Sequence, residues 1–268
     1  MFIRGCPSIL PDVHDDEPGE RPDGNRSLIE IFEQHSGNTS DKWSHYPEIY
    51  ERHLAKLRGQ PVNLVEIGVF NGGSLQIWRK YFGPDANIFG VDIDPKCELL
   101  IDDGAEFILG DQADPAFLEK LKAKLPRIDI VIDDGGHQAQ QQISTFEMLY
   151  PHLADGGIYI VEDLHTSYWP HFGGGYGRES FIEHSKRLID LLHEWYWYNP
   201  VSQSFIQPPS DRTEAMPVGD FAKSTFGLFF YDSMLVIEKT KRGEPWMRLY
   251  GQLKREEILA KRAVVVED

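Results

Sequence analysis

Hydrophobic residues in the middle of the chain form short runs that alternate with stretches of helical periodicity. The runs predict strands at residues 62–68, 86–92, 107–109, 128–133 and 157–162. Helices are expected at residues 74–82, from the pair Asp114-Pro115 onward, and at 138–153. Nearly continuous apolar strands in alternation with helices are typical of a parallel sheet covered on both faces. The pattern therefore predicts a doubly wound α/β fold.

The N-terminal region lacks this alternation. Residues 1–25 are rich in proline, glycine and acidic residues, so we expect a loosely ordered lead-in there. Ser27 and Glu30 have the spacing of a capping box, in which each side chain accepts from the other's backbone amide, and they predict a short helix. A second helix is expected at residues 46–58, ending at Gly59. We expect residues 26–268 to form a single domain.

The C-terminal region also departs from the alternation. A helix is expected at residues 179–196, and the polar, proline-containing stretch 199–219 is interpreted as either a mobile lid or a long surface loop. Two β-rich runs, 224–230 and 233–238, predict an antiparallel hairpin, and a helix is expected near residues 246–261. Together with the five earlier strands, the hairpin gives a mostly parallel, seven-stranded sheet.

Composition and charge narrow the class of protein. The 268 residues are 41% hydrophobic, enough for the core of one large domain. The 43 acidic and 27 basic residues give a formal charge of −16, which disfavours nucleic acid as a partner. No run reaches the roughly 18 apolar residues of a membrane helix, and the N-terminus lacks a signal-peptide pattern, so we expect a cytoplasmic protein. Cys6 and Cys97 predict neither a disulfide framework nor a zinc site.

A glycine-rich turn follows the first predicted strand, with Gly68, Gly72 and Gly73 before Ser74. Glycines allow close approach of a ligand, and the next helix points its positive end at that ligand. Asp92 ends the second strand, where a carboxylate accepts hydrogen bonds from ribose hydroxyls. The spacing differs from dinucleotide and nucleoside-triphosphate loops, so another nucleoside cofactor is favoured. The alternative is an ordinary strand-to-helix turn beside a solvated Asp92.

Acidic residues end the fourth and fifth predicted strands. The first pair is Asp133-Asp134, and the second is Glu162-Asp163. Neighbouring parallel strands would bring Asp134, Glu162 and Asp163 together, and three carboxylates gather only with a compensating cation. Oxygen ligands favour Mg²⁺, with Mn²⁺ or Ca²⁺ as weaker candidates. The alternative is that the acidic strand ends cap helices and face water.

His137 follows Asp134 by three residues, at the predicted start of a helix. The positive helix end should keep its imidazole neutral, which suits a general base. The alternative is a histidine that only packs or caps the helix, and this is the interpretation we give His165. A metal held by two vicinal oxygens would lower the pKa of an acceptor hydroxyl while the base removes its proton.

The cofactor motifs resemble those of class I S-adenosylmethionine-dependent methyltransferases. The resemblance lies in Glu66-x-Gly68 with a wide glycine turn, in Asp92, and in Gly-Asp-Gln at 110–112. It implies a Rossmann-like fold and S-adenosylmethionine as cofactor, with the methionine part near the glycine turn, the ribose at Asp92 and the adenine near Asp111. The implied cofactor-binding residues are Glu66, Gly68, Asn71, Ser74, Asp92, Asp111, Gln112 and Asp133.

Longer segments resemble metal-dependent sugar O-methyltransferases that act on macrolide-linked deoxysugars and related glycosides. The matching segments are 40–43 with Tyr46, 133–137 and 162–169, within a resemblance that covers about 40–174 and the hairpin. It implies Asp134, Glu162 and Asp163 as metal ligands, His137 as base, and methylation of a deoxyhexose or mannoside hydroxyl. The macrolide enzymes carry an extra N-terminal domain, where this chain has a short lead-in.

The acceptor side is expected to contain aromatic residues. Tyr168, Trp169 and His171, with the glycines at 173–175, would line it, because aromatic faces suit the apolar faces of a sugar ring. The alternative for Tyr168 and Trp169 is plain core packing. Two other functions remain open: a catechol-type small-molecule O-methyltransferase, and a non-catalytic methyltransferase-like binding subunit. A homo-oligomer is possible.

Overall fold

The computed structural model describes residues 26–101, 104–197, 205, 208–212, 215–248 and 250–251. A seven-stranded sheet runs through the centre of this part of the chain, in the order β3-β2-β1-β4-β5-β7-β6. The strands are β1 (Asn63–Ile67), β2 (Asn87–Asp92), β3 (Glu106–Leu109), β4 (Ile128–Asp133), β5 (Leu153–Val161), β6 (Thr225–Tyr231) and β7 (Met234–Lys239). β1 to β5 are parallel, and β7 lies antiparallel between β5 and β6. The predicted sheet and its C-terminal hairpin are confirmed.

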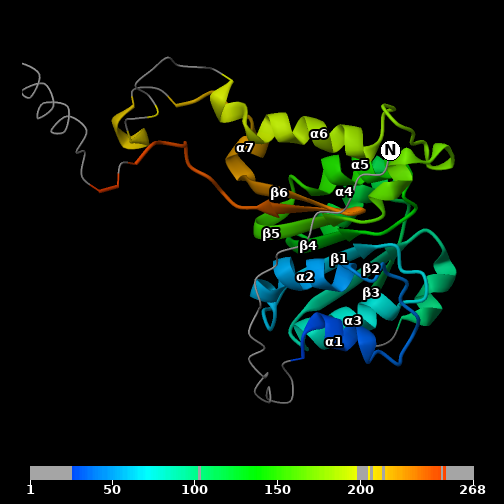
Figure 1. Ribbon diagram of the computed structural model, residues 1–268. Coiled ribbons are helices and arrows are strands. Elements are labelled where there is room, and N and C mark those ends of the chain that lie inside the picture. Colours follow the sequence, from blue (N-terminus) through cyan, green and yellow to red (C-terminus); the bar gives the residue numbers. More distant parts are fainter. Residues whose placement is uncertain are drawn as a thin grey trace, which may run out of the picture.

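Helices cover both faces of the sheet. They are α1 (Leu28–Glu33), α2 (Tyr46–Leu54), α3 (Gly73–Phe82), α4 (Pro115–Lys124), α5 (Ala139–Leu149), α6 (Phe181–Leu192) and α7 (Asp220–Ser224). Figure 1 shows α1, α2 and α3 on one side of the sheet and α4, α5 and α6 on the other. Short 3₁₀ helices include η2 (Pro95–Leu100), η3 (Leu164–Tyr168), η4 (Pro170–Phe172), η5 (Glu194–Tyr196) and η7 (Pro209–Asp211).

Two apolar cores hold these layers together. In β4, Ile130 and Ile132 pack toward α1, α2 and α3, whereas Val131 packs toward α4, α5 and α6. Successive side chains of a strand point to opposite faces, so a strand that is buried on both faces must be apolar throughout. Burial of this apolar surface is the main force that stabilises the fold.

Local signals explain where several helices begin and end. Ser27 and Glu30 form the predicted capping box of α1. Asp114 accepts from the backbone of Ala116 and precedes the proline that starts α4. The predicted helix at 138–153 ends earlier, at Leu149, because Leu153 already pairs in β5. The predicted helix at 179–196 is α6 followed by η5.

The strand register places the site. Ile67 at the end of β1 pairs with Val91 of β2 and Asp133 of β4, and Asp133 pairs with Val161 of β5. The loops after these four strands therefore start at the same edge of the sheet. The order of the strands reverses between β1 and β4, and ligands of open α/β sheets bind at such a point.

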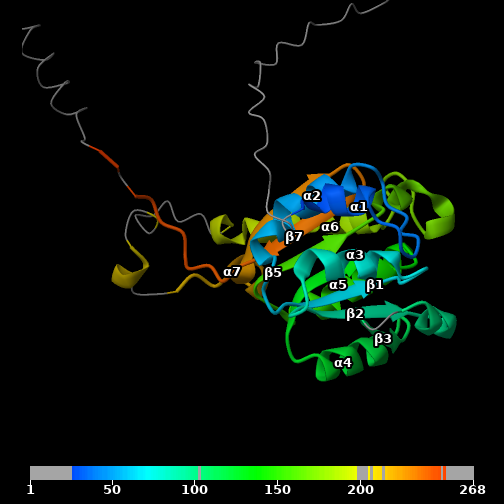
Figure 2. The ribbon, with the colours of Figure 1, turned by 90° about the horizontal axis from the view of Figure 1, so that it is seen from below.

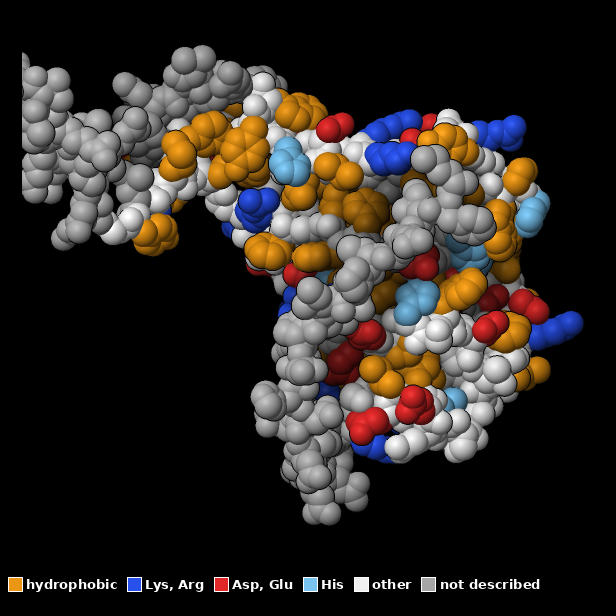
Figure 3. Space-filling model, in the orientation of Figure 1, with side chains coloured by type: hydrophobic (Ala, Val, Ile, Leu, Met, Phe, Trp, Pro, Cys, Tyr) orange, Lys and Arg blue, Asp and Glu red, His pale blue; other side chains and the backbone are white. Residues whose placement is uncertain are grey.

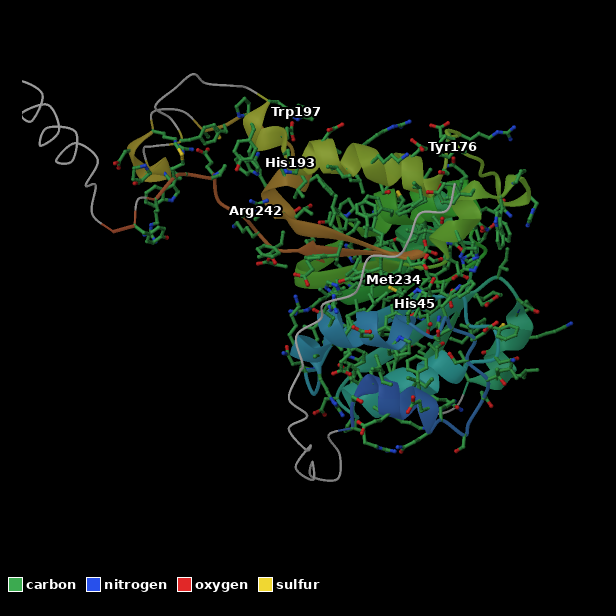
Figure 4. All side chains as sticks on the ribbon, in the orientation of Figure 1. His45, Tyr176, His193, Trp197, Met234 and Arg242 are labelled. Atoms are coloured by element: carbon green, nitrogen blue, oxygen red, sulfur yellow. The ribbon has the colours of Figure 1, made fainter. Side chains whose placement is uncertain are left out.

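The C-terminal hairpin packs against the N-terminal helix α2. Figure 2 shows α2 over β7, and Figure 4 labels His45, the N-cap of α2, and Met234, the first residue of β7. His45 Nε2 lies 2.9 Å from the backbone oxygen of Asp232, and His53 Nδ1 lies 2.9 Å from Glu238 Oε1. Helix α2 and the C-terminal hairpin thus meet beside the sheet.

Residues beyond β7 run away from the sheet, and Figure 3 shows hydrophobic side chains where this segment leaves it. Residues 246–248 and 250–251 are not helical, and the rest of the helix predicted near 246–261 lies outside the described residues, as does the lead-in at 1–25. The predicted lid or loop at 199–219 is described only in part, where it contains η7. Within the described ranges, no helix combines the length and apolar character needed to cross a membrane. The single domain and the cytoplasmic location stay predictions.

Candidate functional site

A cavity of about 780 Å³ opens at the carboxyl ends of β1, β2, β4 and β5. This volume falls within the range usual for small-molecule and cofactor sites. The predicted site residues that line it are Gly68, Ser74, Asp92, Asp111, Gln112, Asp134, His137 and Asp163. The predicted site residues outside its lining are Glu66, Asn71, Asp133 and Glu162. The structure thus brings most of the predicted cofactor-binding and metal-binding residues to one cavity. The other four lie outside its lining.

The glycine turn is shaped by close packing as well as by backbone conformation. Gly68 and Gly72 have positive φ values of 93° and 77°. A Cβ at Gly68 would collide with the carbonyl oxygen of Asp134, and a Cβ at Gly73 would collide with that of Asn38. Glycine is therefore required for β1 and β4 to approach each other at the cavity floor.

Asp92 is fixed to this turn by backbone amides. Its Oδ2 accepts from Val69 N at 2.9 Å and Phe70 N at 3.4 Å, and its Oδ1 accepts from Asp94 N at 2.9 Å. The carboxylate is half-buried and lines the cavity. These contacts hold it at the end of β2, the position predicted for a ribose ligand.

Glu66 lies beneath the turn. It is fully buried, and its Oε2 accepts from Ser74 Oγ at 2.8 Å and Trp78 Nε1 at 3.0 Å. Burial raises the pKa of Glu66 to about 6, although the charge of Lys42 opposes this rise. Glu66 therefore holds Ser74 in position, and Ser74 rather than Glu66 lines the cavity.

Gln112, in the cavity lining, bonds to Asp133 behind it. Gln112 Nε2 donates to Asp133 Oδ1 at 2.9 Å, and its Oε1 accepts from Gly136 N at 3.0 Å. Asp133 is buried, and burial raises its pKa to about 7. The amide of Gln112 is thus used to join the loops after β3 and β4, whereas Asp111 lines the cavity beside it.

Two predicted metal-binding carboxylates face His137 in the cavity. His137 Nε2 lies 3.5 Å from Asp163 Oδ2 and 3.9 Å from Asp134 Oδ1. One potential ligand atom from each of these three residues lies within 4.8 Å of the others, so the group could hold a metal ion. Mg²⁺ prefers oxygen ligands, whereas imidazole suits transition metals, so the geometry allows His137 to be either a ligand or a base.

The third predicted metal ligand, Glu162, is turned toward other partners. It is fully buried, and its Oε1 accepts from the hydroxyl of Tyr50 at 2.5 Å. Its Oε2 lies 3.1 Å from Lys42 Nζ. Glu162 therefore lies outside the cavity lining, and Lys42, which is part of the lining, contacts both Glu162 and Asp134.

Sequence reasoning assigned no role to Lys42, yet its side chain is only 4% exposed and contacts three carboxylates. Its Nζ contacts Asp134 Oδ2 and Glu162 Oε2, and it lies 3.6 Å from Glu66 Oε1. Burial alone would lower the pKa of Lys42, but these carboxylates raise it well above its ordinary value, so the ammonium stays charged. Clustered carboxylates require a nearby cation, and this requirement is the signal that could have identified Lys42 from the sequence.

The carboxylates around Lys42 carry more negative charge than its one ammonium compensates. Burial, with the charge of Asp134, raises the pKa of Glu162 well above its ordinary value in spite of Lys42. Burial also raises the pKa of Asp134, although Lys42 lowers it. One ammonium shared by several buried carboxylates leaves negative charge uncompensated, and a divalent cation fits this donor set.

Tyr46 ties Asp163 to the C-terminal hairpin. Its hydroxyl lies 2.9 Å from Asp163 Oδ1 and 3.0 Å from the backbone oxygen of Ser233, and it accepts from Asp163 N at 3.1 Å. Ser233 Oγ also lies 2.6 Å from His165 Nδ1. The turn between β6 and β7 therefore fixes both Asp163 and His165 at the cavity.

Aromatic rings lie at the rim of the cavity: Trp43 and His165 line it, whereas Tyr168, Trp169 and His171, predicted to line the acceptor side, are outside its lining. The ring of His165 lies 5.4 Å from that of Trp43 and 4.7 Å from that of Trp169, both edge-on. Trp169 also stacks on His171 at 5.8 Å. Tyr168 and Trp169 are 51% and 44% exposed, so the alternative that they are plain core residues is wrong.

Strained backbone surrounds the same cavity. Among the described residues, the non-glycine positions with positive φ are Phe70, His137, Asp163 and Ser233. Phe70, His137 and Asp163 line the cavity, and Ser233 contacts Tyr46. Such conformations cost about 1–3 kcal/mol each and gather at functional sites. His137 lies just before the N-cap of α5, at the predicted start of this helix.

Comparison with known proteins agrees with this geometry. Residues 65–164 match the model of a methyltransferase domain. The strand order and the likeness to a solved methyltransferase show the fold of class I methyltransferases, with the cavity at the ends of the strands.

Named relatives narrow the class. The chain is 36% identical over 231 residues to 8-demethyl-8-(2-methoxy-alpha-L-rhamnosyl)-tetracenomycin-C 3'-O-methyltransferase of Streptomyces olivaceus, covering 81% of this chain and 55% of that one. It is 34% identical to mycinamicin VI 2''-O-methyltransferase of Micromonospora griseorubida, covering 73% of this chain and 48% of that one. The predicted resemblance to sugar O-methyltransferases is confirmed, although the chain spans about half the length of these relatives.

A solved structure shows the same similarity. The MycE methyltransferase from the mycinamycin biosynthetic pathway, in complex with Mg, SAH and mycinamycin VI, is 28% identical with a TM-score of 0.68. The match covers 88% of this chain and 59% of that one.

Proposed function

We propose that the protein transfers a methyl group from S-adenosylmethionine to a hydroxyl of a sugar or glycoside, with the help of Mg²⁺. The observation that carries this proposal is a single cavity in which the glycine turn and Asp92 lie opposite Asp134, His137 and Asp163. Because the chain spans about half of its relatives, the activity of the whole protein belongs to this proposal.

The cofactor would occupy the β1–β2 half of the cavity. The turn at Gly68 and the hydroxyl of Ser74 would receive its methionine part, while Asp92 accepts from its ribose. Asp111 lies beyond Asp92 at the end of β3, near the place expected for adenine. The similar MycE protein was solved with SAH, which is S-adenosylhomocysteine, the demethylated product of S-adenosylmethionine. That complex supports this arrangement.

The metal would bind in the β4–β5 half. Asp134 and Asp163 supply oxygens that face the cavity, and Glu162 lies directly behind Asp134. A divalent cation there, Mg²⁺ or Mn²⁺, would lower the pKa of a hydroxyl that it chelates. The MycE structure that resembles this chain was solved with Mg.

His137 would remove the proton of the acceptor hydroxyl. Its Nε2 faces Asp134 and Asp163, whereas its Nδ1 is buried and has no hydrogen-bond partner among the described residues. Nε2 is therefore the nitrogen available for the transferred proton. Asp163, 3.5 Å away, would stabilise the imidazolium that forms.

The aromatic rim favours a sugar acceptor. Trp43 lines the cavity near the proposed metal ligands, and the partly exposed ring of Trp169 packs on His165 beside it; such rings suit the apolar side of a pyranose. Relatives are named for rhamnosyl and mycinamicin substrates. We therefore propose a deoxyhexose glycoside as the acceptor class.

A methyl-transfer assay tests this function. The full chain is incubated with S-adenosylmethionine carrying a labelled methyl group, MgCl₂, and either rhamnosides, mannosides or catechol. We expect label in a glycoside, loss of transfer with chelator, and recovery with excess Mg²⁺. Methylation of catechol alone would assign a different acceptor class, and SAH binding without transfer to any acceptor would favour a non-catalytic subunit.

A further inference from the structure

Lys42 belongs to the cavity lining and carries a nearly buried ammonium beside the carboxylate cluster. It lies in the loop before α2, and its Nζ contacts Asp134 and Glu162 and lies 3.6 Å from Glu66. Neither the proposed cofactor contacts nor the proposed base uses it. The N-terminal part of the chain thus places a positive charge where the two halves of the cavity meet.

The oxygens that Lys42 contacts belong to residues that would also bind the metal. Asp134 Oδ2 contacts Lys42, whereas Asp134 Oδ1 lies toward His137. Glu162 Oε2 contacts Lys42, whereas Glu162 Oε1 accepts from Tyr50. A metal ion bound by Asp134 would therefore share this carboxylate with the lysine, which also contacts Glu162, the predicted third ligand.

We propose that Lys42 is a positioning residue that weakens metal binding while it holds the metal ligands in place. Its ammonium keeps Asp134 and Glu162 together, and its charge repels a divalent cation on the same carboxylates. The inference rests on the proposed function, since it requires the metal to bind at this cluster.

The same contacts connect metal binding with stability. Removing one partner of a buried ion pair leaves the remaining charges uncompensated, so the protein without metal needs Lys42. A bound cation would replace that compensation, and a ligand selective for the folded state stabilises it by mass action. Metal must therefore stabilise a variant without this charge more than it stabilises the wild type.

The test compares the full-length wild type with Lys42→Met, Lys42→Arg and Lys120→Met. Methionine removes the charge of Lys42 with little change in length, and arginine retains the charge. Lys120 is exposed on α4, so its variant controls for the loss of one surface charge. After treatment with chelator, MgCl₂ is titrated into each protein by calorimetry, and thermal unfolding is followed with and without Mg²⁺.

We expect Lys42→Met to bind Mg²⁺ at least about tenfold more tightly than the wild type, because a repelling charge next to the ion is gone. Its Tm without metal should fall, and its rise in Tm with Mg²⁺ should exceed that of the wild type. Lys42→Arg and Lys120→Met should bind Mg²⁺ as weakly as the wild type. A purely structural lysine would change stability without tightening metal binding.

Equal or weaker Mg²⁺ binding by a folded Lys42→Met protein would overturn the inference and leave the proposed function intact. If this variant does not fold without metal, it should fold as MgCl₂ is added, and failure to fold at any concentration would also overturn the inference. Absence of Mg²⁺ binding by the wild type would instead remove the metal site from the proposed function, and the inference with it.

Discussion

The two halves of the cavity are held in different ways. On the β1–β2 half, backbone amides of Val69 and Asp94 fix Asp92, and Gly68 packs directly against backbone. On the β4–β5 half, buried side-chain charges fix one another, with Lys42 between Asp134 and its neighbours. A site built from backbone depends on local sequence, whereas one built from buried charges depends on every charge in the group.

The largest expected effect comes from removing one carboxylate of the β4–β5 half. Asp134→Ala should lower Mg²⁺ affinity more than about 100-fold, since losing even a partner of a metal ligand costs roughly 10–100-fold. Methyl transfer should vanish with it. Calorimetry with SAH provides the contrast, because affinity for this product should stay near the wild-type value. If Asp134→Ala also lost SAH binding, the β1–β2 and β4–β5 halves of the cavity would not act independently.

The second largest effect separates proton transfer from the binding of cofactor and the binding of metal. His137→Ala should slow methyl transfer by about 10²–10⁴-fold, the usual contribution of a general base. Because its Nδ1 has no partner among the described residues, the fold should lose little stability. Rates at saturating Mg²⁺, SAH titrations and Tm values together provide the measurement. Near-normal turnover would remove His137 from the mechanism, and Asp133 or His165 would be tested as the base.

A smaller effect is expected on the β1–β2 half. Asp92→Ala should weaken SAH binding roughly 10–100-fold, the equivalent of about 1.5–3 kcal/mol for hydrogen bonds to a charged group. Mg²⁺ affinity should not change, because the hydrogen bonds of Asp92 go to the backbone of Val69, Phe70 and Asp94 rather than to the acidic cluster. Calorimetric titration of each ligand checks both statements. Unchanged SAH affinity would contradict the ribose assignment.

The smallest effect concerns pH and the buried Asp133. Burial raises its pKa from 3.8 to about 7, so folding favours the protonated carboxyl. Its contribution to stability is full below about pH 4, decreases as the pH rises toward 7, and is lost above it. Asp133→Asn mimics the protonated form and should stabilise the chelator-treated protein at pH 8 by on the order of 1–3 kcal/mol.

Urea unfolding at pH 4 and pH 8 measures this difference. The advantage of Asp133→Asn over the wild type should grow between these values and level off above pH 7. An advantage that is the same at both pH values would show that Asp133 does not titrate as its burial implies. Asp111→Asn, at a half-buried position on the cavity wall, provides the matched control.

Features with a local cause were predictable from the sequence. The strands appear as apolar runs, and the capping box at Ser27 lies within one helical turn. Parallel strands end at one edge, so the placement of Asp92, Asp134 and Asp163 around one cavity followed from the order of elements. The ends of helices were less certain, as at Leu149, because pairing of β5 with β4 decides where the helix stops.

Features that depend on distant partners were not predictable. Lys42 lies 92 positions before Asp134, and Tyr50 lies 112 positions before Glu162, so no local pattern joins them. Their contacts turn Glu162 away from the cavity, a matter of side-chain orientation that spacing does not specify. The burial of Asp133 behind Gln112 has the same origin, since it depends on how the loop after β3 meets β4.

The left-handed residues around the cavity carry a consequence for directed evolution. Replacing Phe70, His137 or Asp163 with glycine would relieve a backbone penalty, so selection for heat resistance alone should favour such changes. Each change would also delete a side chain that faces the cavity. Selection for heat resistance would therefore favour glycine at these positions, whereas selection for function would favour the present residues. Libraries aimed at a more robust variant should leave them fixed and vary the apolar layers instead.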